Sequence, residues 1–269
     1  MKTLEDALAQ TNLSGIKISY DDMGRGEPAL LFMPGWCVNR TVFHDLLVHC
    51  STRRRVLSLD WRGHGESGPP AGDFALNGLV DDALAVIKAS GVRFIVPVAL
   101  AHAGWVAIEL KHKLKIQVPK LVLIDWLVAE APAPFLETLE AMEDRTRWRE
   151  AVNDLLKSWQ KDTNHPRLIQ FIRDEIGAYG FEMWARAART ISTAYSVSGS
   201  PLGELSALQP PVPVLHLYAQ PPDEEYLALQ QAFAADNPWF HVQRLAAKSH
   251  FPMFEVPTEI TSAIEKFVQ

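Results

Sequence analysis

The sequence predicts an α/β protein with a mostly parallel sheet, helices on both faces of the sheet and an inserted helical cap. Short apolar runs alternate with segments of helical periodicity at both ends of the chain, which is typical of a parallel sheet covered on both faces. The middle of the chain interrupts this alternation with a long helical stretch. The 269 residues, 48% of them hydrophobic, are enough to bury one large core.

The first half of the chain contains four predicted strands and two predicted helices. Each strand is a short apolar run, and Pro34 ends the first run whereas Asp60 ends the second. Gly91 supplies a stop for the first helix. The expected strands are Ala29–Met33, Arg55–Leu59, Phe94–Leu100 and Lys120–Ile124, and the expected helices are Val80–Ser90 and Gly104–Leu114.

The segment 128–200 has no evident strand and is rich in Trp, Arg and Glu at helical spacing. We expect it to form a cap over the carboxyl edge of the sheet, inserted into one α/β core that comprises residues 1–127 and 201–269. The alternation resumes after the turn-rich residues Ser198–Pro201. The expected elements there are strands Val212–Ala219 and Phe240–Leu245, a helix over Asp223–Ala235 and a last helix from about Pro257.

Composition and charge restrict the partners and the compartment of the protein. A net charge of −6 without a basic block argues against a nucleic-acid partner. Two cysteines, Cys37 and Cys50, cannot form a disulfide framework, which favours a reducing compartment. Met1–Gln10 lacks the apolar region of a secretory signal, and no apolar run approaches the roughly 20 residues of a membrane span. We therefore expect a cytoplasmic protein without a membrane partner.

Four loops that follow predicted strands, or join a strand to a helix, carry the residues with chemical potential. Ligand sites of open parallel sheets lie at the carboxyl ends of the strands, so these loops are expected to converge. The loops are Met33–Cys37 (MPGWC), Asp60–Ser67 (DWRGHGES), Ala99–Trp105 (ALAHAGW) and Ser249–Pro252 (SHFP).

Together these loops resemble the α/β-hydrolase family over nearly the whole chain. The DxRGHGxS pattern at Asp60–Ser67 is a specific hallmark of that family, and His250 stands where the family has its catalytic base. The loop Ala99–Trp105 has the small residues that the nucleophile elbow requires, because strand and helix approach closely there. The position of the nucleophile itself is occupied by Ala101.

Ala101 has no hydroxyl or thiol, so no acyl-enzyme can form at this position. The neighbouring side chains do not replace the nucleophile, because His102 is expected to point elsewhere and Ser67 and Ser249 belong to other loops. The backbone amides of Trp36 and His102 are still expected to form an oxyanion hole, since backbone donors survive any change of side chain. A base and an oxyanion hole without a nucleophile favour proton abstraction from an acidic organic substrate.

The sequence also resembles one group with this fold, the cofactor-independent 2,4-dioxygenases of 3-hydroxy-4(1H)-quinolones. The Asp-Trp-Leu run is the most telling match, because typical hydrolases place their acid after the seventh strand rather than the sixth. Members of this group usually have a serine at the elbow, and Ala101 departs from that pattern. The matching positions are Pro34–Cys37, His102 with Trp105, Ile124–Leu127, Trp159 and His250–Pro252.

The resemblance implies a mechanism without metal or flavin, on a small aromatic substrate and O2. His250, oriented by Asp125, takes the proton of the 3-hydroxyl group. The substrate anion then reacts with dioxygen to give a peroxide at C2, which attacks C4 and releases carbon monoxide and an N-acylanthranilate. The other residues implied in substrate binding or in the oxyanion hole are Trp36, Cys37, Ala101, His102 and Trp159.

Several alternatives stay open at this point. Asp223, after the seventh predicted strand, competes with Asp125 as the partner of His250. Trp159 at helical spacing also suits a core residue, and Cys37 suits a small apolar pocket residue. The histidines outside the four loops lack metal-ligand spacing. As a whole, the protein could instead be an esterase-like hydrolase whose serine was lost or engineered to Ala101, or a non-catalytic ligand-binding homologue.

Overall fold

The structure is a computed structural model that describes residues 7–269. Most of Met1–Gln10, for which no secretory signal is expected, lies outside the described residues. Eight strands form one sheet in the order β1-β2-β4-β3-β5-β6-β7-β8. The strands are β1 (Leu8–Leu13), β2 (Ile16–Met23), β3 (Ala29–Met33), β4 (Val56–Leu59), β5 (Ile95–Leu100), β6 (Leu121–Ile124), β7 (Val214–Tyr218) and β8 (Phe240–Arg244).

The six strands from β3 to β8 run parallel, and their residues are almost all apolar and buried except in β8 at the edge. A strand buried on both faces is expected to be a continuous apolar run rather than an alternating one. All six correspond to predicted strands, with ends that differ by at most two residues. The predicted mostly parallel sheet is therefore confirmed.

The first two strands were not predicted from the sequence. β1 pairs antiparallel with β2, and β2 pairs antiparallel with β4. Ser14 and Gly15 connect β1 to β2, and both have positive φ angles (50° and 89°), as a tight hairpin turn requires. The alternation of apolar and polar residues in Ile16–Tyr20 is the sequence signal for this edge hairpin.

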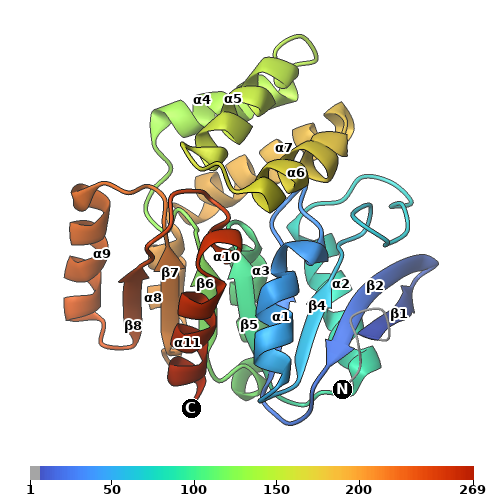
Figure 1. Cartoon of the computed structure of the whole chain (residues 1–269), viewed down its shortest axis with the longest axis vertical. Helices are drawn as coiled ribbons and strands as arrows, with labels where there is room; N and C mark the ends of the chain where they lie inside the picture. Colours follow the sequence, from blue (N-terminus) through green and yellow to red (C-terminus); the bar gives the residue numbers. More distant parts are fainter. Residues whose placement is uncertain (1–6) are drawn as a thin grey trace.

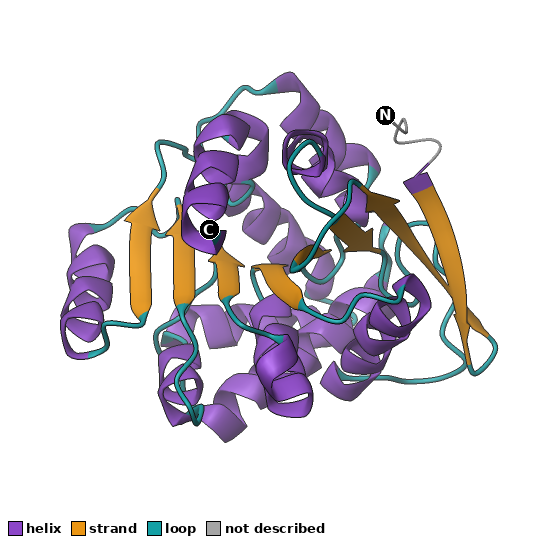
Figure 2. Ribbon diagram, turned by 90° about the horizontal axis from the view of Figure 1, so that it is seen from below, coloured by secondary structure: helices purple, strands orange, loops and turns teal. Residues whose placement is uncertain are grey.

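Helices cover both faces of the sheet. Figure 1 shows α1 and α11 in front of the strands and α2, α3 and α8 behind them, and Figure 2 shows the strands in a row between two helical layers. The α-helices of the part of the chain that the structure describes are α1 (His44–Ser51), α2 (Leu76–Ser90), α3 (Ala103–Leu114), α4 (Ala133–Glu143), α5 (Trp148–Gln160), α6 (Pro166–Asp174), α7 (Phe181–Ser198), α8 (Pro201–Ala207), α9 (Glu224–Asp236), α10 (Pro252–Glu255) and α11 (Pro257–Val268).

Four of these helices, α4 to α7, follow β6 and lie above the sheet in Figure 1. α4 packs on α5 and α7, so the four helices form a layer of their own. This arrangement confirms the inserted helical cap of the predicted fold class. We propose that the cap comprises residues 128–200, as the sequence predicts, with 1–127 and 201–269 as the core.

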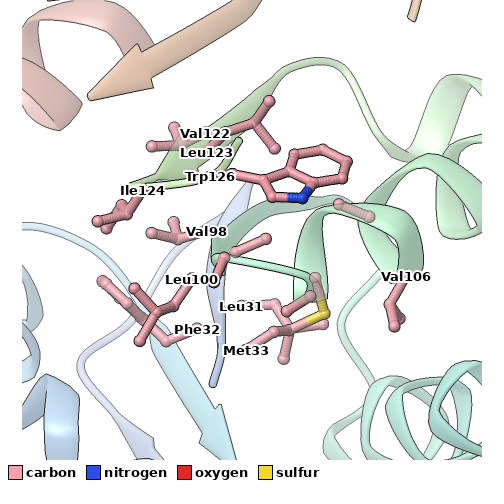
Figure 3. Packing of buried hydrophobic residues seen from close by; sticks show 14 of the residues in the cluster. Leu31, Phe32, Met33, Val98, Leu100, Val106, Val122, Leu123, Ile124 and Trp126 are labelled. Atoms are coloured by element: carbon pink, nitrogen blue, oxygen red, sulfur yellow. The ribbon is translucent and has the colours of Figure 1, made fainter. Parts of the chain in front are cut away.

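The central strands and the helices packed on them form a continuous hydrophobic core. Figure 3 shows side chains of β3, β5 and β6 packed together with Trp126, which follows β6 and is fully buried. This rigid centre fixes the strand ends from which the candidate site is built. None of the helices among residues 7–269 is both long enough and apolar enough to cross a membrane.

Candidate active site

The loops after β3, β5 and β8 meet the cap helices around a small cavity at the carboxyl edge of the sheet. Its walls are almost entirely apolar, and its free volume is about 30 Å³. The lining residues are Gly35, Trp36, Val38, Leu100, Ala101, His102, Phe135, Leu139, Met142, Leu155, Trp159, Trp184, Ala187, Ile191, His250 and Phe251.

Asp125 and His250 form a hydrogen-bonded pair beside this cavity. The His250 Nδ1 atom lies 2.7 Å from Asp125 Oδ2, and Asp125 Oδ1 accepts the backbone N–H groups of Ala219 and Gln220. Asp125 is 2% exposed and has a φ of 47°, so its side chain is held at a sharp bend after β6. A carboxylate can only accept, so Nδ1 carries the proton and Nε2 is left with a free lone pair. The pair therefore has the arrangement of a general base and the group that orients it.

Asp223, the competing candidate, lies elsewhere. Its side chain accepts the N–H of Tyr226 and caps the N-terminus of α9. Such a cap satisfies one of the free backbone donors of a helix. The geometry therefore gives Asp223 a structural contact and places Asp125 beside His250.

Ala101 occupies a strained turn between β5 and α3. Its φ is 48°, and the turn is closed by the hydrogen bond from the Gly104 N–H to the Ala101 carbonyl (3.0 Å). A Cβ atom on Gly104 would lie 2.2 Å from the Trp126 ring, so only glycine allows this close approach. The elbow of a nucleophile is thus retained in full, although Ala101 presents only a methyl group to the cavity.

Two backbone amides beside this methyl group are free to bind a ligand. Neither the Trp36 N–H nor the His102 N–H donates a hydrogen bond to another group in the described part of the chain. Both residues line the cavity, and the Trp36 ring stacks on Phe74 with a centroid distance of 5.4 Å. Free donors at this position suit an oxygen atom that gains negative charge during a reaction.

His102, which the resemblance implies in substrate binding, lines the cavity. The ring stacks on Phe135 of α4 with a centroid distance of 5.8 Å. Burial, with a smaller electrostatic contribution from the neighbouring His250, lowers the pKa of His102 to about 3. The imidazole is therefore neutral at physiological pH, and its Nδ1 atom has no hydrogen-bond partner among the residues described.

Cys37 is not among the residues that line the cavity, and its neighbour Val38 lines it instead. The thiol is fully buried, which raises its pKa well above the usual value. The Cys37 N–H donates to His64 Nε2 (3.0 Å), and burial lowers the pKa of His64 to about 4, so this acceptor stays neutral. That Cys37 is a pocket residue stays a prediction, and His64 fixes the backbone of the loop.

Trp159, in the last turn of α5, lies directly against the candidate base. Its indole stacks on the His250 imidazole with a centroid distance of 4.7 Å and an angle of 26° between the planes. Its carbonyl accepts the His250 backbone N–H (2.8 Å). The cap thus contacts His250 through both the side chain and the main chain of one residue.

Most of the cap residues that line the cavity were not predicted from the sequence. Phe135, Leu139 and Met142 line the cavity from α4, and Trp184 and Ile191 line it from α7. The three residues of α4 are spaced four and three positions apart, which puts them on one face of the helix. That spacing is a signal in the sequence, but it does not say whether the face meets a cavity or a neighbouring helix.

Within residues 7–269, no group of three or more His, Cys, Asp and Glu side chains is placed to hold a metal ion. The site combines an imidazole oriented by Asp125, a second, neutral imidazole at His102, two free amides and an apolar wall.

Comparison with known proteins agrees with this arrangement. Residues 30–263 match the model of the Alpha/beta hydrolase family. The chain is 36% identical to a 2-heptyl-3-hydroxy-4-quinolone dioxygenase of Rhodococcus erythropolis, over 97% of this chain and 98% of the relative. It is 32% identical to the 1H-3-hydroxy-4-oxoquinoline 2,4-dioxygenase of Pseudomonas putida, over 96% of this chain and 98% of the relative.

Among solved structures, an AqdC variant in complex with its substrate, the Pseudomonas quinolone signal, matches with a TM-score of 0.92 and 31% identity. This match covers 97% of the present chain and 98% of that chain. The protein therefore belongs to the α/β hydrolase family and, within it, to the group of 3-hydroxy-4-quinolone dioxygenases.

Proposed function

We propose that the protein is a cofactor-free dioxygenase that cleaves the heterocyclic ring of a 2-alkyl-3-hydroxy-4(1H)-quinolone. The observation that carries this proposal is the His250–Asp125 pair beside an elbow whose nucleophile position holds Ala101. A base without a nucleophile can ionise a substrate but cannot form a bond to it. The heptyl substituent named for the Rhodococcus relative makes the 2-heptyl compound the first substrate to test.

The reaction begins with a proton transfer. His250 Nε2 accepts the proton of the substrate 3-hydroxyl group, and Asp125 stabilises the imidazolium that results through the hydrogen bond to Nδ1. The apolar cavity excludes water, which strengthens the interactions of the substrate anion with the groups around it. The substrate anion is electron-rich, and this property lets it act as the reductant of dioxygen.

Dioxygen is the second substrate, and both of its atoms enter the organic product. The anion transfers one electron to O2, and the radical pair combines to a peroxide at C2. The peroxide attacks the C4 carbonyl, and the bicyclic intermediate collapses with loss of C3 as carbon monoxide. The N-acylanthranilate that remains carries one oxygen atom from O2 at each of the former C2 and C4 positions.

The free amides of Trp36 and His102 bind the C4 oxygen in this scheme, since that atom becomes negative when the peroxide attacks. Neutral His102 places no positive charge beside His250, because the pKa of His102 is lowered to about 3. Trp159 packs over His250 and closes the cavity from the cap side. We further propose that this reaction takes place in the cytoplasm and without a metal ion or flavin.

The test is incubation of the purified protein with 2-methyl- and 2-heptyl-3-hydroxy-4(1H)-quinolone while oxygen uptake and carbon monoxide release are followed. Equal amounts of oxygen consumed and carbon monoxide released, unaffected by a metal chelator, are the expected result. Absence of oxygen uptake with both compounds would overturn the proposal.

The variant Ala101→Ser separates the proposal from an esterase that has lost its nucleophile. A dioxygenase is expected to retain oxygen uptake, because the base and the two amides are unchanged. Hydrolysis of aryl esters without oxygen uptake on either quinolone would instead identify a hydrolase.

A further inference from the structure

Gln220 contacts both the candidate acid and the cap. Its backbone N–H donates to Asp125 Oδ1 (2.9 Å). Its side-chain Nε2 lies 2.8 Å from the carbonyl oxygen of Lys248 and 3.2 Å from that of Ser158, and 3.5 Å from that of Trp159. Gln220, in the loop after β7, therefore joins three segments by itself. They are the loop of Asp125, the loop that precedes His250, and the end of α5.

These contacts satisfy carbonyl groups that the helix itself cannot. The last carbonyls of an α-helix have no intrahelical donor. At the end of α5, the Lys157 carbonyl accepts the N–H of Lys161, whereas the carbonyls of Ser158 and Trp159 point to donors outside the helix. The Gln220 amide and the His250 N–H are those donors. The end of this cap helix is thus capped by the core.

The capped turn carries Trp159, whose ring stacks on the imidazole of His250. A shift of this turn would move the indole away from the imidazole and would also break the hydrogen bond from the His250 N–H. The amide of Gln220 has two N–H donors, and both are directed at carbonyl groups of the two segments that must stay together.

We infer that Gln220 is a positioning residue for ring cleavage. Its side chain holds the end of α5 against the loop that precedes His250, so that Trp159 stays over His250. This inference rests on the proposed function. It assigns a role to the side chain of Gln220 that differs from the role of its backbone N–H, because only the side chain reaches the cap. The role is exerted through Trp159 and requires no contact between Gln220 and the substrate.

The test compares Gln220→Met, which keeps the length of the side chain but removes both donors, with Trp159→Ala and the double variant. Loss of the amide contacts is expected to lower kcat/KM about tenfold. In the Trp159→Ala background the same substitution should change kcat/KM less than twofold, because residues that act through one contact are not additive. Gln220→Glu, which is isosteric and polar but lacks the donors at neutral pH, replaces Gln220→Met if the latter does not fold.

Gln117→Met is the matched control. Gln117 is half-buried like Gln220, and its amide donates to the Arg93 carbonyl (2.9 Å) far from the cavity. Loss of this hydrogen bond is expected to leave kcat/KM within twofold of the wild type. An equal effect of Gln220→Met with and without Trp159, or no effect while the wild type is active, would overturn the inference.

Hydrogen exchange provides a readout that does not depend on turnover. The His250 amide hydrogen is protected only while α5 stays docked, because its acceptor is the Trp159 carbonyl. Gln220→Met should therefore accelerate exchange of this amide at least about fivefold, and Gln117→Met should not. Unchanged exchange overturns the inference. An inactive wild type with accelerated exchange in Gln220→Met would contradict the proposed substrate and leave the positioning of the cap supported.

Discussion

The carboxyl edge of the sheet and the cap contribute to the candidate site in different ways. The sheet edge supplies the polar groups, and each is fixed by a backbone bend or a buried hydrogen bond, as Asp125 and Ala101 show. The cap supplies mainly apolar surface, and Trp159 of the cap stacks on the base. The difference indicates that the chemistry depends on the core, whereas the fit of the substrate depends on the cap.

The largest effect on turnover is expected from His250→Ala, which removes the candidate base that Asp125 orients. Turnover of the quinolone should fall by roughly 10²–10⁴-fold, the usual contribution of general-base catalysis. Substrate affinity, measured by quenching of tryptophan fluorescence, should stay within a few-fold, because the apolar wall remains. A variant that retains more than a tenth of wild-type turnover would contradict a base role for His250.

Acid pH is expected to destabilise the core. Burial lowers the pKa values of His64 and His216 to about 4, so the unfolded chain binds more protons than the folded chain between pH 4 and 6.5. The free energy of unfolding should therefore fall as the pH drops through this window, by up to about 1.4 kcal/mol per pH unit for each histidine. Urea titrations at several pH values measure this slope. Stability that is flat between pH 6.5 and 4.5 would show that these imidazoles are not buried in the neutral form.

A methyl group at the elbow tests how tightly the core is packed there. Gly104→Ala would place its Cβ against the Trp126 ring, and overpacking of this kind costs roughly 1–3 kcal/mol. The melting temperature should fall by several degrees. Gly72→Ala is the matched control, because no atom lies within 4 Å of the position of its Cβ. Equal melting temperatures for the two variants would mean that the elbow tolerates a looser approach of strand and helix.

The smallest effect on the reaction is expected from substitution of a cap residue. Phe135→Ala removes a ring that lines the cavity and stacks on His102, so KM should rise a few-fold while kcat stays within about twofold. Leu136→Ala, a change of the exposed neighbour on the same helix, should alter neither value. A large fall in kcat with unchanged KM would assign the cap a part in the chemistry and would weaken the contrast with the core.

The sequence predicts the core better than the cap for a physical reason. Buried parallel strands are continuous apolar runs, so β3 to β7 and the loops that follow them could be located from the sequence. Asp125 directly follows such a run and His250 lies in the loop after β8, and their places in the Asp-Trp-Leu and Ser-His-Phe-Pro segments were sufficient to select them. β1 was missed because it is a half-exposed edge strand, and β2 because its apolar and polar residues alternate only over a short stretch.

The packing of the cap could not be predicted in the same way. Apolar residues at helical spacing show that a helix has a buried face, but several packings of four short helices satisfy one pattern. Gln220 was missed because its contacts join segments about 28 and 62 residues away in the chain. The place of His102 in the cavity likewise depends on the path of the backbone through the tight turn at Ala101.

The cavity between these two regions has a free volume of about 30 Å³, whereas pockets for small organic ligands usually measure roughly 300–1,000 Å³. A fused two-ring compound therefore requires the residues that line the cavity to move apart before it binds. Substrate binding therefore includes a conformational step of the protein, and the second-order rate constant of association should fall well below the limit set by diffusion.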